Sequence, residues 1–163
     1  MVNLKFFIDS TILFDSIVND MNGRKLKRKL HHIKNDNHIL TTSLTVFGEI
    51  ILVCLRDKRI DDLHDIIDLI VSLDIQSWTP NLVLRNCCKC LDKVDKHNRV
   101  GSSDRTHLAY AIAYEDEYFI TDDSDLQKFP LDKCNCRKCK RSKKPKTNII
   151  SSNQITSILN SNQ

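Results

Sequence analysis

The chain has 163 residues, of which 40% are hydrophobic and three are glycine, and its formal net charge is +4. This length and composition suit one compact domain with a real core. The sequence has no apolar run near the ~18 residues of a membrane span and no signal-peptide layout at its start, which excludes a membrane protein and predicts a cytoplasmic one.

The chain begins with a predicted strand over residues 5–9, in which Phe6-Phe7-Ile8 is followed by Asp9. A continuous apolar run of this length is typical of a strand buried on both faces of a parallel sheet, with Asp9 at its carboxyl end. Helical spacing then predicts a helix over residues 11–21, with Asn22-Gly23 as its C-cap, and a second helix over residues 24–34. The second is crowded with Lys and Arg, which form either a solvated face or a phosphate-contacting surface.

A second predicted strand, residues 38–42, leads into a helix over residues 44–56 that is apolar nearly all round but carries Glu49. No Lys or Arg lies three or four residues from Glu49, so its charge has no local partner. Because burying an unpaired charge is costly, Glu49 is expected to bind a cation, to pair with a distant Arg, or to be protonated.

The next predicted elements are a helix over residues 60–73, a strand over 74–78 and a helix from 80 to about 96 with Thr79 as its N-cap. The first of these helices reads as amphipathic, with its aspartates on the outer face. Cys54, Cys87 and Cys88 fall on apolar stripes and are interpreted as small core residues.

Residues 101–128 contain the elements around which the other candidate site residues are expected to gather. This stretch predicts a helix capped by Ser102 or Ser103 with Asp104 in its first turn, followed by a strand over residues 118–121. Just past the end of that strand it predicts an acidic turn with Asp122, Asp123 and Asp125. His107 lies one turn after Asp104 and is expected to orient a neighbouring group rather than to react. A last strand over 148–151 and a last helix after residue 153 complete the chain.

Strands and helices alternate throughout, which predicts an α/β fold with a mainly parallel sheet of about five strands and helices on both faces. In such a sheet, ligands bind beyond the carboxyl ends of the strands, so Asp9, Glu49, Asp104 and the Asp122–Asp125 turn can meet at one edge. A cluster of carboxylates without cationic partners repels itself unless a divalent cation neutralises it, and hard oxygen ligands select Mg²⁺ or Mn²⁺. The chemistry that most often uses such a site is metal-assisted phosphodiester hydrolysis.

Four motifs resemble a known family: F-F-I-D-S-T from Phe6, T-S-L-T-V-F-G-E-I through Glu49, D-R-T-H-L-A-Y-A from Asp104, and F-I-T-D-D-S-D-L from Phe119. In their order and spacing they resemble the PIN-domain nucleases, particularly the VapC-like toxins of toxin-antitoxin pairs. The resemblance implies a PIN-like three-layer α/β/α domain over residues 1–163.

The resemblance also implies a Mg²⁺- or Mn²⁺-dependent endoribonuclease that acts on RNA. Its catalytic metal ligands would be Asp9, Glu49, Asp104 and Asp123, with Asp125 as an auxiliary acid at the metal site. Ser10 and Thr121 would be polar neighbours of this site, together with His107 as the orienting residue expected from its place one turn after Asp104.

Two features depart from the family pattern. Thr11 stands where many relatives have Asn, which changes part of the hydrogen bonding that the family pattern implies around the site. The second departure is a basic, cysteine-rich insertion at residues 131–147. Its Lys and Arg residues are candidate RNA contacts: Arg137, Lys138, Lys140, Arg141, Lys143 and Lys144.

The insertion also carries Cys134, Cys136 and Cys139, which offer three of the four ligands of a structural Zn²⁺ ion. Cys90, which forms C-x-x-C with Cys87, is the candidate fourth ligand. The alternative is a flexible basic loop with incidental thiols.

Several functions remain open at this point. The leading expectation is a ribonuclease, either a type II toxin held by a cognate antitoxin or a housekeeping enzyme that processes rRNA or tRNA. The alternatives are a non-catalytic RNA-binding PIN module and a zinc-stabilised interaction protein. The expected partners are RNA, an antitoxin protein and a second copy of the chain in a homodimer, without a membrane.

Overall fold

The computed structural model describes residues 3–95, 99–134 and 147–161. Its sheet has five parallel strands in the order β3-β2-β1-β4-β5. The strands are β1 (Lys5–Ile8), β2 (Ile39–Ser43), β3 (Gln76–Trp78), β4 (Tyr118–Ile120) and β5 (Asn148–Ile150). The predicted α/β fold with a parallel sheet is confirmed.

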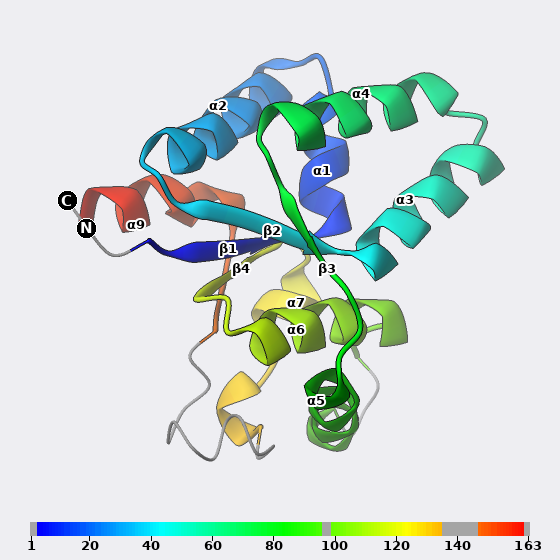
Figure 1. Ribbon diagram of the computed structural model, residues 1–163, viewed down its shortest axis with the longest axis vertical. Helices are drawn as coiled ribbons and strands as arrows, with labels where there is room; N and C mark the ends of the chain where they lie inside the picture. The colour runs from blue at the N-terminus through cyan, green and yellow to red at the C-terminus, as the bar shows by residue number, and fades with distance from the viewer. Residues whose placement is uncertain (1–2, 96–98, 135–146, 162–163) are drawn as a thin grey trace.

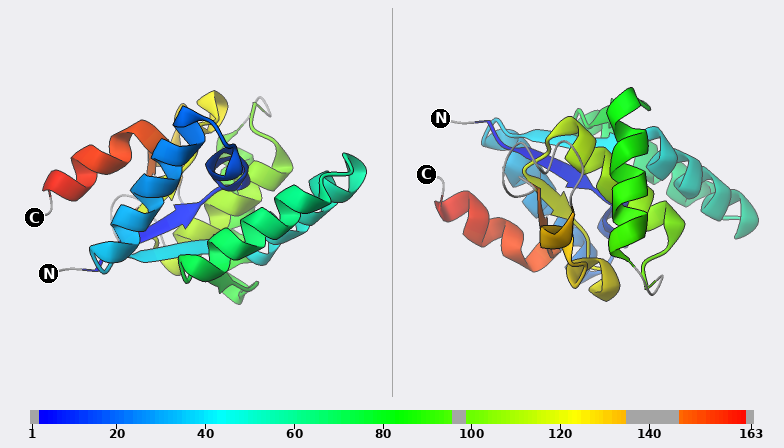
Figure 2. Two further views of the ribbon diagram at one scale, coloured as in Figure 1. Left: turned by 90° about the horizontal axis from the view of Figure 1, so that it is seen from above. Right: turned by 90° about the horizontal axis from the view of Figure 1, so that it is seen from below.

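Helices cover both faces of this sheet (Figure 1). The described helices are α1 (Ser10–Ile17), α2 (Met21–Asn35), α3 (Leu44–Arg56), α4 (Ile60–Ser72), α5 (Leu82–Val94), α6 (Ser102–Tyr114), α7 (Ser124–Gln127), η1 (Leu131–Lys133), η2 (Ser152–Gln154) and α9 (Ile155–Ser161). Helices α1, α2 and α9 lie on one side of the sheet, and α5 and α6 lie on the other (Figures 1 and 2). Helices α3 and α4 lie side by side and extend away from the sheet, with α4 on the side of α1 and α2. The fold is therefore the predicted three-layer α/β/α arrangement.

The apolar run that predicted β1 forms the centre of the core. Phe6, Phe7 and Ile8 are fully buried, and Phe7 pairs in register with Thr41 on β2 and Phe119 on β4. A central strand covered by helices on both faces needs apolar side chains pointing in both directions, which explains the uninterrupted run. Cys54 and Cys87 are also fully buried, as expected of core cysteines.

Two predicted helix boundaries are wrong. The first helix ends at Ile17, and Gly23, expected to end it, lies in the first turn of α2. A Cβ atom on Gly23 would lie 2.1 Å from the Val18 carbonyl oxygen, so the close approach of the two helices requires a glycine there. The N-cap of α5 is Asn81 instead of Thr79, because its side chain accepts hydrogen bonds from two amides of the first turn.

The strand order places a topological switch point between β1 and β4. From β1 the chain builds outward through β2 and β3 on one side, and β4 and β5 occupy the other side. At such a point the loops beyond the carboxyl ends of the two strands separate and leave room for a ligand. Asp9 follows β1 and Asp123 lies just past β4, so the fold carries these two acids to the switch point.

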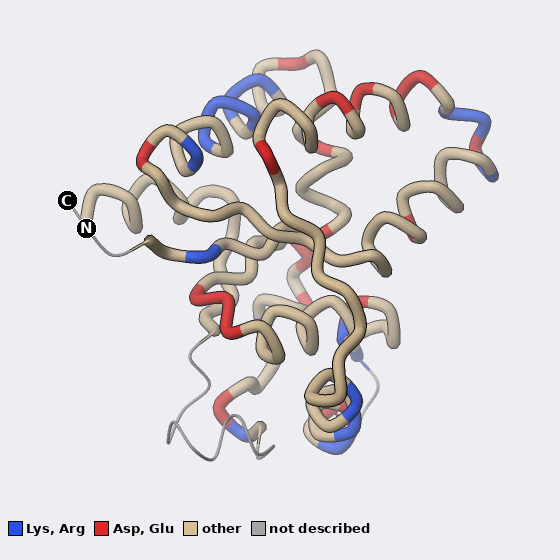
Figure 3. Tube along the Cα trace, viewed as in Figure 1, with Lys and Arg blue, Asp and Glu red and all other residues tan. Residues whose placement is uncertain are grey.

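Among the described residues, no helix has both the length and the apolar character needed to cross a membrane. Figure 3 shows that Lys and Arg gather along α2 and α5, whereas Asp is frequent along α4. The assignment of residues 1–163 to one domain with an insertion at 131–147 stays a prediction, because residues 135–146 lie outside the described part of the chain.

Candidate active site

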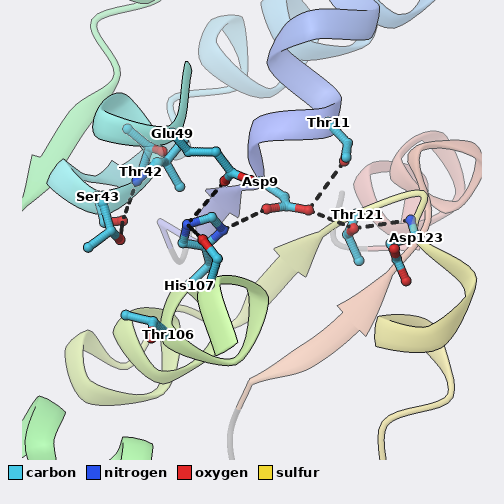
Figure 4. A network of polar contacts seen from close by, with 12 residues as sticks. Asp9, Thr11, Thr42, Ser43, Glu49, Thr106, His107, Thr121 and Asp123 are labelled. Carbon is cyan, nitrogen blue, oxygen red and sulfur yellow. Dashed lines mark hydrogen bonds and ion pairs between the residues drawn. The ribbon is translucent and has the colours of Figure 1, made fainter. Parts of the chain in front are cut away.

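Asp9 lies at the centre of a polar network at the switch point (Figure 4). Its side chain is only 1% exposed. Its Oδ2 accepts hydrogen bonds from Thr121 Oγ1 at 2.9 Å and from Thr11 Oγ1 at 3.2 Å, and its Oδ1 lies 3.0 Å from His107 Nδ1. Because three groups hold the carboxylate, its orientation is fixed before any ligand binds.

His107 bridges two carboxylates that come from different elements. Its ring is fully buried on α6, with Nδ1 facing Asp9 on one side. On the other side Nε2 lies 3.5 Å from Glu49 Oε2 and 3.4 Å from Ser103 Oγ. These contacts are those that an orienting imidazole would make, and the role of His107 stays a prediction.

Glu49 reaches this network from the middle of α3. Its side chain is about one-third exposed, but Oε2 is buried and makes no hydrogen bond within the described residues. The contact of 3.5 Å with His107 is therefore a charge interaction at most. Of the three alternatives for Glu49, pairing with a distant Arg is wrong among the described residues, which contain no Glu49–Arg ion pair.

Asp104 lies one turn before His107 in the first turn of α6. Burial raises the pKa of Asp104 above its usual value, and the charges of nearby carboxylates raise it further, whereas His107 acts to lower it. These carboxylates belong to Asp9, Glu49 and Asp123. The four acids therefore share one electrostatic field, although they are far apart in the sequence.

The cation next to Asp104 in the sequence does not neutralise it. Arg105 points toward α5, where its Nε lies 3.0 Å from Asp92 Oδ1 and its Nη1 lies 2.9 Å from Asp95 Oδ2. Although burial acts to raise it, the pKa of Asp95 is lowered overall by hydrogen bonds from the Val100 and Arg99 amides and from Arg105. Arg105 thus anchors α6 to α5 and leaves the acidic site without its charge.

A glycine gives the Asp104 carboxylate its space. A Cβ atom on Gly101, the N-cap residue of α6, would lie 2.8 Å from Asp104 Oδ2. This distance is too short for a carbon against a carboxylate oxygen, so a larger residue would push the carboxylate away. The N-cap of α6 is thus Gly101, in place of the serines expected from the sequence.

Asp123 combines two roles at the end of β4. Its Oδ1 accepts hydrogen bonds from the amides of Asp125 and Leu126 and so caps α7, and its own amide donates to Thr121 Oγ1. Asp122 points elsewhere, since its Oδ1 accepts from the Ser152 amide at 2.8 Å. Of the acidic turn, Asp123 therefore contributes most directly to the site.

The structure thus brings Asp9, Glu49, Asp104 and Asp123 together with His107 and Thr121. Ser10, another expected neighbour, is buried at the start of α1. Asp125 is exposed and lines an adjacent cavity of about 370 Å³ together with Arg99 and Lys128. Within the described ranges, no three His, Cys, Asp or Glu side chains already surround one metal position.

Thr11, Ser103 and Gly101 are site residues whose roles the sequence did not reveal. Thr11 supplies a hydrogen bond to Asp9, so its replacement of Asn does not leave the carboxylate without that contact. Ser103 precedes His107 by one helical turn, a spacing that could have indicated their contact. The candidate RNA contacts Arg137, Lys138, Lys140, Arg141, Lys143 and Lys144, and the candidate zinc ligands Cys136 and Cys139, lie outside the described residues.

The fold and site define a class of α/β/α proteins with a cluster of carboxylates at the switch point of a parallel sheet. The family model described as PIN domain matches residues 6–131. The chain therefore belongs to the PIN-domain family. Membership of this family supports a nuclease, and PIN domains generally use divalent metal ions.

A solved structure shares this fold. The crystal structure of VapBC2 from Rickettsia felis, bound to a DNA fragment from their promoter, matches with a TM-score of 0.63 and 11% sequence identity. The match covers 91% of this chain and 98% of the other. At this identity the similarity concerns the fold alone. No curated protein matches this chain.

Proposed function

We propose that the chain is a Mg²⁺- or Mn²⁺-dependent endoribonuclease that hydrolyses phosphodiester bonds in RNA. The observation that carries this proposal is the common electrostatic field of Asp104, Asp9, Glu49 and Asp123, which contains no Lys or Arg partner among the described residues. Repulsion between these acids is relieved when a divalent cation binds, and carboxylate oxygens suit Mg²⁺ and Mn²⁺.

The residues present fit such an ion. Glu49 Oε2 is a buried oxygen that accepts no hydrogen bond within the described residues and has only the 3.5 Å contact with His107 Nε2, so it offers a ligand atom to a cation. The oxygens of Asp9, Asp104 and Asp123 would complete the set, with Asp125 at its edge. When bound, the ion supplies activation of water and stabilisation of the leaving oxygen.

The protein's own residues prepare the site for this chemistry. Thr11, Thr121 and His107 hold Asp9 in place, so little reorganisation is needed at the moment of reaction. His107 also keeps Glu49 beside Asp9, because its two ring nitrogens face the two carboxylates. Arg99 and Lys128 lie beside Asp125 in the adjacent cavity and can attract the phosphates of RNA.

Metal dependence is the direct test. RNA cleavage is expected in Mg²⁺ or Mn²⁺ and to fall to background in excess chelator, because carboxylates alone provide no strong nucleophile or electrophile. The measurement is cleavage of a fluorescent single-stranded RNA, with a DNA oligonucleotide of the same sequence as control. Full activity in excess chelator would contradict the metal mechanism, and cleavage of only the DNA would contradict the choice of substrate.

We also propose that the chain is a toxin with a protein antitoxin. Seven large apolar side chains are exposed on α3 and α4, among them Leu52 at 69% and Val71 at 73%. Exposed apolar residues in such number favour a surface that a partner covers. The structural relative named VapBC2 makes an antitoxin a reasonable occupant.

The adjacent reading frame tests this partner. It is expected to encode a small DNA-binding protein that binds this chain and inhibits RNA cleavage. A variant with Leu52 and Val71 both changed to Ser tests the surface itself. It should bind the antitoxin more weakly and retain RNA cleavage. Absence of such a gene, together with a dimeric mass of the purified chain, would assign the surface to a homodimer and favour a housekeeping enzyme for rRNA or tRNA.

We further propose that the insertion at residues 131–147 is a second RNA-binding surface. Its cations would offset the repulsion between the acidic site and a polyanion. Since Arg137, Lys138, Lys140, Arg141, Lys143 and Lys144 lie outside the described residues, their contact with RNA stays a prediction.

A further inference from the structure

Two cysteines that are 44 residues apart meet on the side of the sheet covered by α5 and α6. Cys134 directly follows η1, which packs against α5, and its Sγ lies 3.1 Å from the Sγ of Cys90. Cys134 is 7% exposed, and Cys90 is partly buried near the end of α5. The fold thus pairs one thiol of the C-x-x-C sequence on α5 with the first thiol of the insertion.

The distance between the two sulfurs can be compared with two kinds of bonding. A disulfide needs about 2.05 Å, and two thiolates on one tetrahedral Zn²⁺ ion, each about 2.3 Å from the metal, lie about 3.8 Å apart. The observed 3.1 Å is about 1 Å too long for the first arrangement and about 0.7 Å too short for the second. Small rotations of both side chains reach either separation, so the surroundings of the two thiols decide between a disulfide and a metal.

The surrounding sequence favours the metal. Two thiolates fill half of a tetrahedral site, and Cys87 lies one helical turn before Cys90 on α5, where it offers a third thiol. Sulfur ligands select Zn²⁺ and related soft ions over the Mg²⁺ and Mn²⁺ preferred by carboxylates. We propose that Cys90 and Cys134 are two ligands of a structural Zn²⁺ ion that joins α5 to the segment following η1.

Such an ion would stabilise the side of the molecule that supports the acidic site. Helix α5 holds α6 through Asp92 and Asp95, which bind Arg105, and α6 carries Asp104 and His107. A cross-link between α5 and η1 therefore restrains the helix on which α6 rests. This metal site is chemically distinct from the carboxylate site, so the two can be tested separately.

The first experiment measures zinc in the full chain purified without chelator. About one Zn²⁺ per chain is expected in the wild type, released by a thiol-modifying mercurial and detected with a metal-sensitive dye. The variants Cys90→Ser and Cys134→Ser should each lose at least about 90% of the zinc, since removal of one thiolate ligand opens the site. The matched control is Cys88→Ser on the same helix, which should keep its zinc. Burial raises the pKa of the Cys88 thiol, which disfavours the thiolate form that binds a metal, and its side chain interacts with Thr106 instead.

A second measurement does not depend on the folding of any variant. Co²⁺ added to zinc-free wild-type chain should give the intense absorption of thiolate-to-cobalt charge transfer, and Zn²⁺ should abolish it by displacement. Absence of this absorption, or equal zinc in the wild type, Cys90→Ser and Cys134→Ser, would overturn the proposal. An intact mass two hydrogens lower under non-reducing conditions, with loss of this difference in Cys90→Ser, would assign the pair to a disulfide instead.

Discussion

The Asp104→Asn variant is expected to cleave RNA about 10³-fold more slowly than the wild-type chain, which corresponds to about 4 kcal/mol of lost transition-state stabilisation. Asp104 shares its electrostatic field with Asp9, Glu49 and Asp123. An amide of nearly the same shape removes one negative ligand and leaves the packing of α6 in place. The measurement is the single-turnover rate of cleavage in saturating Mg²⁺.

The same substitution should stabilise the metal-free protein slightly. Because burial and neighbouring carboxylates raise the pKa of Asp104, its ionised form is disfavoured in the folded chain, and a neutral amide relieves that cost. Thermal unfolding in chelator should therefore show an equal or higher melting temperature than the wild type. The control is Asp61→Asn, an exposed acid in the first turn of α4, which should change neither quantity. A folded Asp104→Asn variant that cleaves at the wild-type rate would remove Asp104 from the site.

The elements that the sequence predicted best are those whose pattern depends on burial. Residues 5–9 form a central strand, and a strand buried on both faces must be apolar at every position, so the run of Phe6, Phe7 and Ile8 has one simple reading. Helix ends were predicted less well. Gly23 is required by the approach of the Val18 carbonyl, a contact between two helices that no local pattern contains.

The acidic site, too, could be predicted only in part from the sequence. Asp9, Glu49, Asp104 and Asp123 could be predicted because each lies in a recognisable motif and the parallel sheet brings the ends of its strands to one edge. The position of His107 between Asp9 and Glu49 could not be derived, because it depends on how α6 and α3 pack beside β1. The fixed orientation of Asp9 likewise depends on Thr121, 112 residues away.

The second large expected effect is on the pH dependence of stability, and it comes from a buried acid outside the site. Asp116 follows α6, is fully buried, and accepts a hydrogen bond on Oδ2 from Trp78 Nε1 at 3.0 Å. Its Oδ1 has no hydrogen-bond partner among the described residues. Burial raises the pKa of Asp116 to about 7, and the contact with Trp78 offsets this only in part.

This pKa couples the stability of the fold to pH. The folded chain holds the proton of Asp116 up to about pH 7, whereas the unfolded chain releases it near the ordinary value of 3.8. The contribution to the free energy of unfolding is therefore fully present below the unfolded pKa and is lost as the pH rises through about 7. Above that pH the fold contains a buried carboxylate whose charge Trp78, Lys5 and Thr41 compensate only in part.

The Asp116→Asn variant should remove this dependence, because its amide is neutral at every pH and can still accept the hydrogen bond from Trp78. Relative to the wild type, its free energy of unfolding should increase by about 3 kcal/mol between pH 5 and pH 8, since each pH unit below the folded pKa is worth about 1.4 kcal/mol. Urea unfolding at several pH values measures this difference, with Asp61→Asn as the exposed control. Parallel stability curves for Asp116→Asn and the wild type would show that Asp116 is ionised throughout this range, with its charge compensated inside the fold.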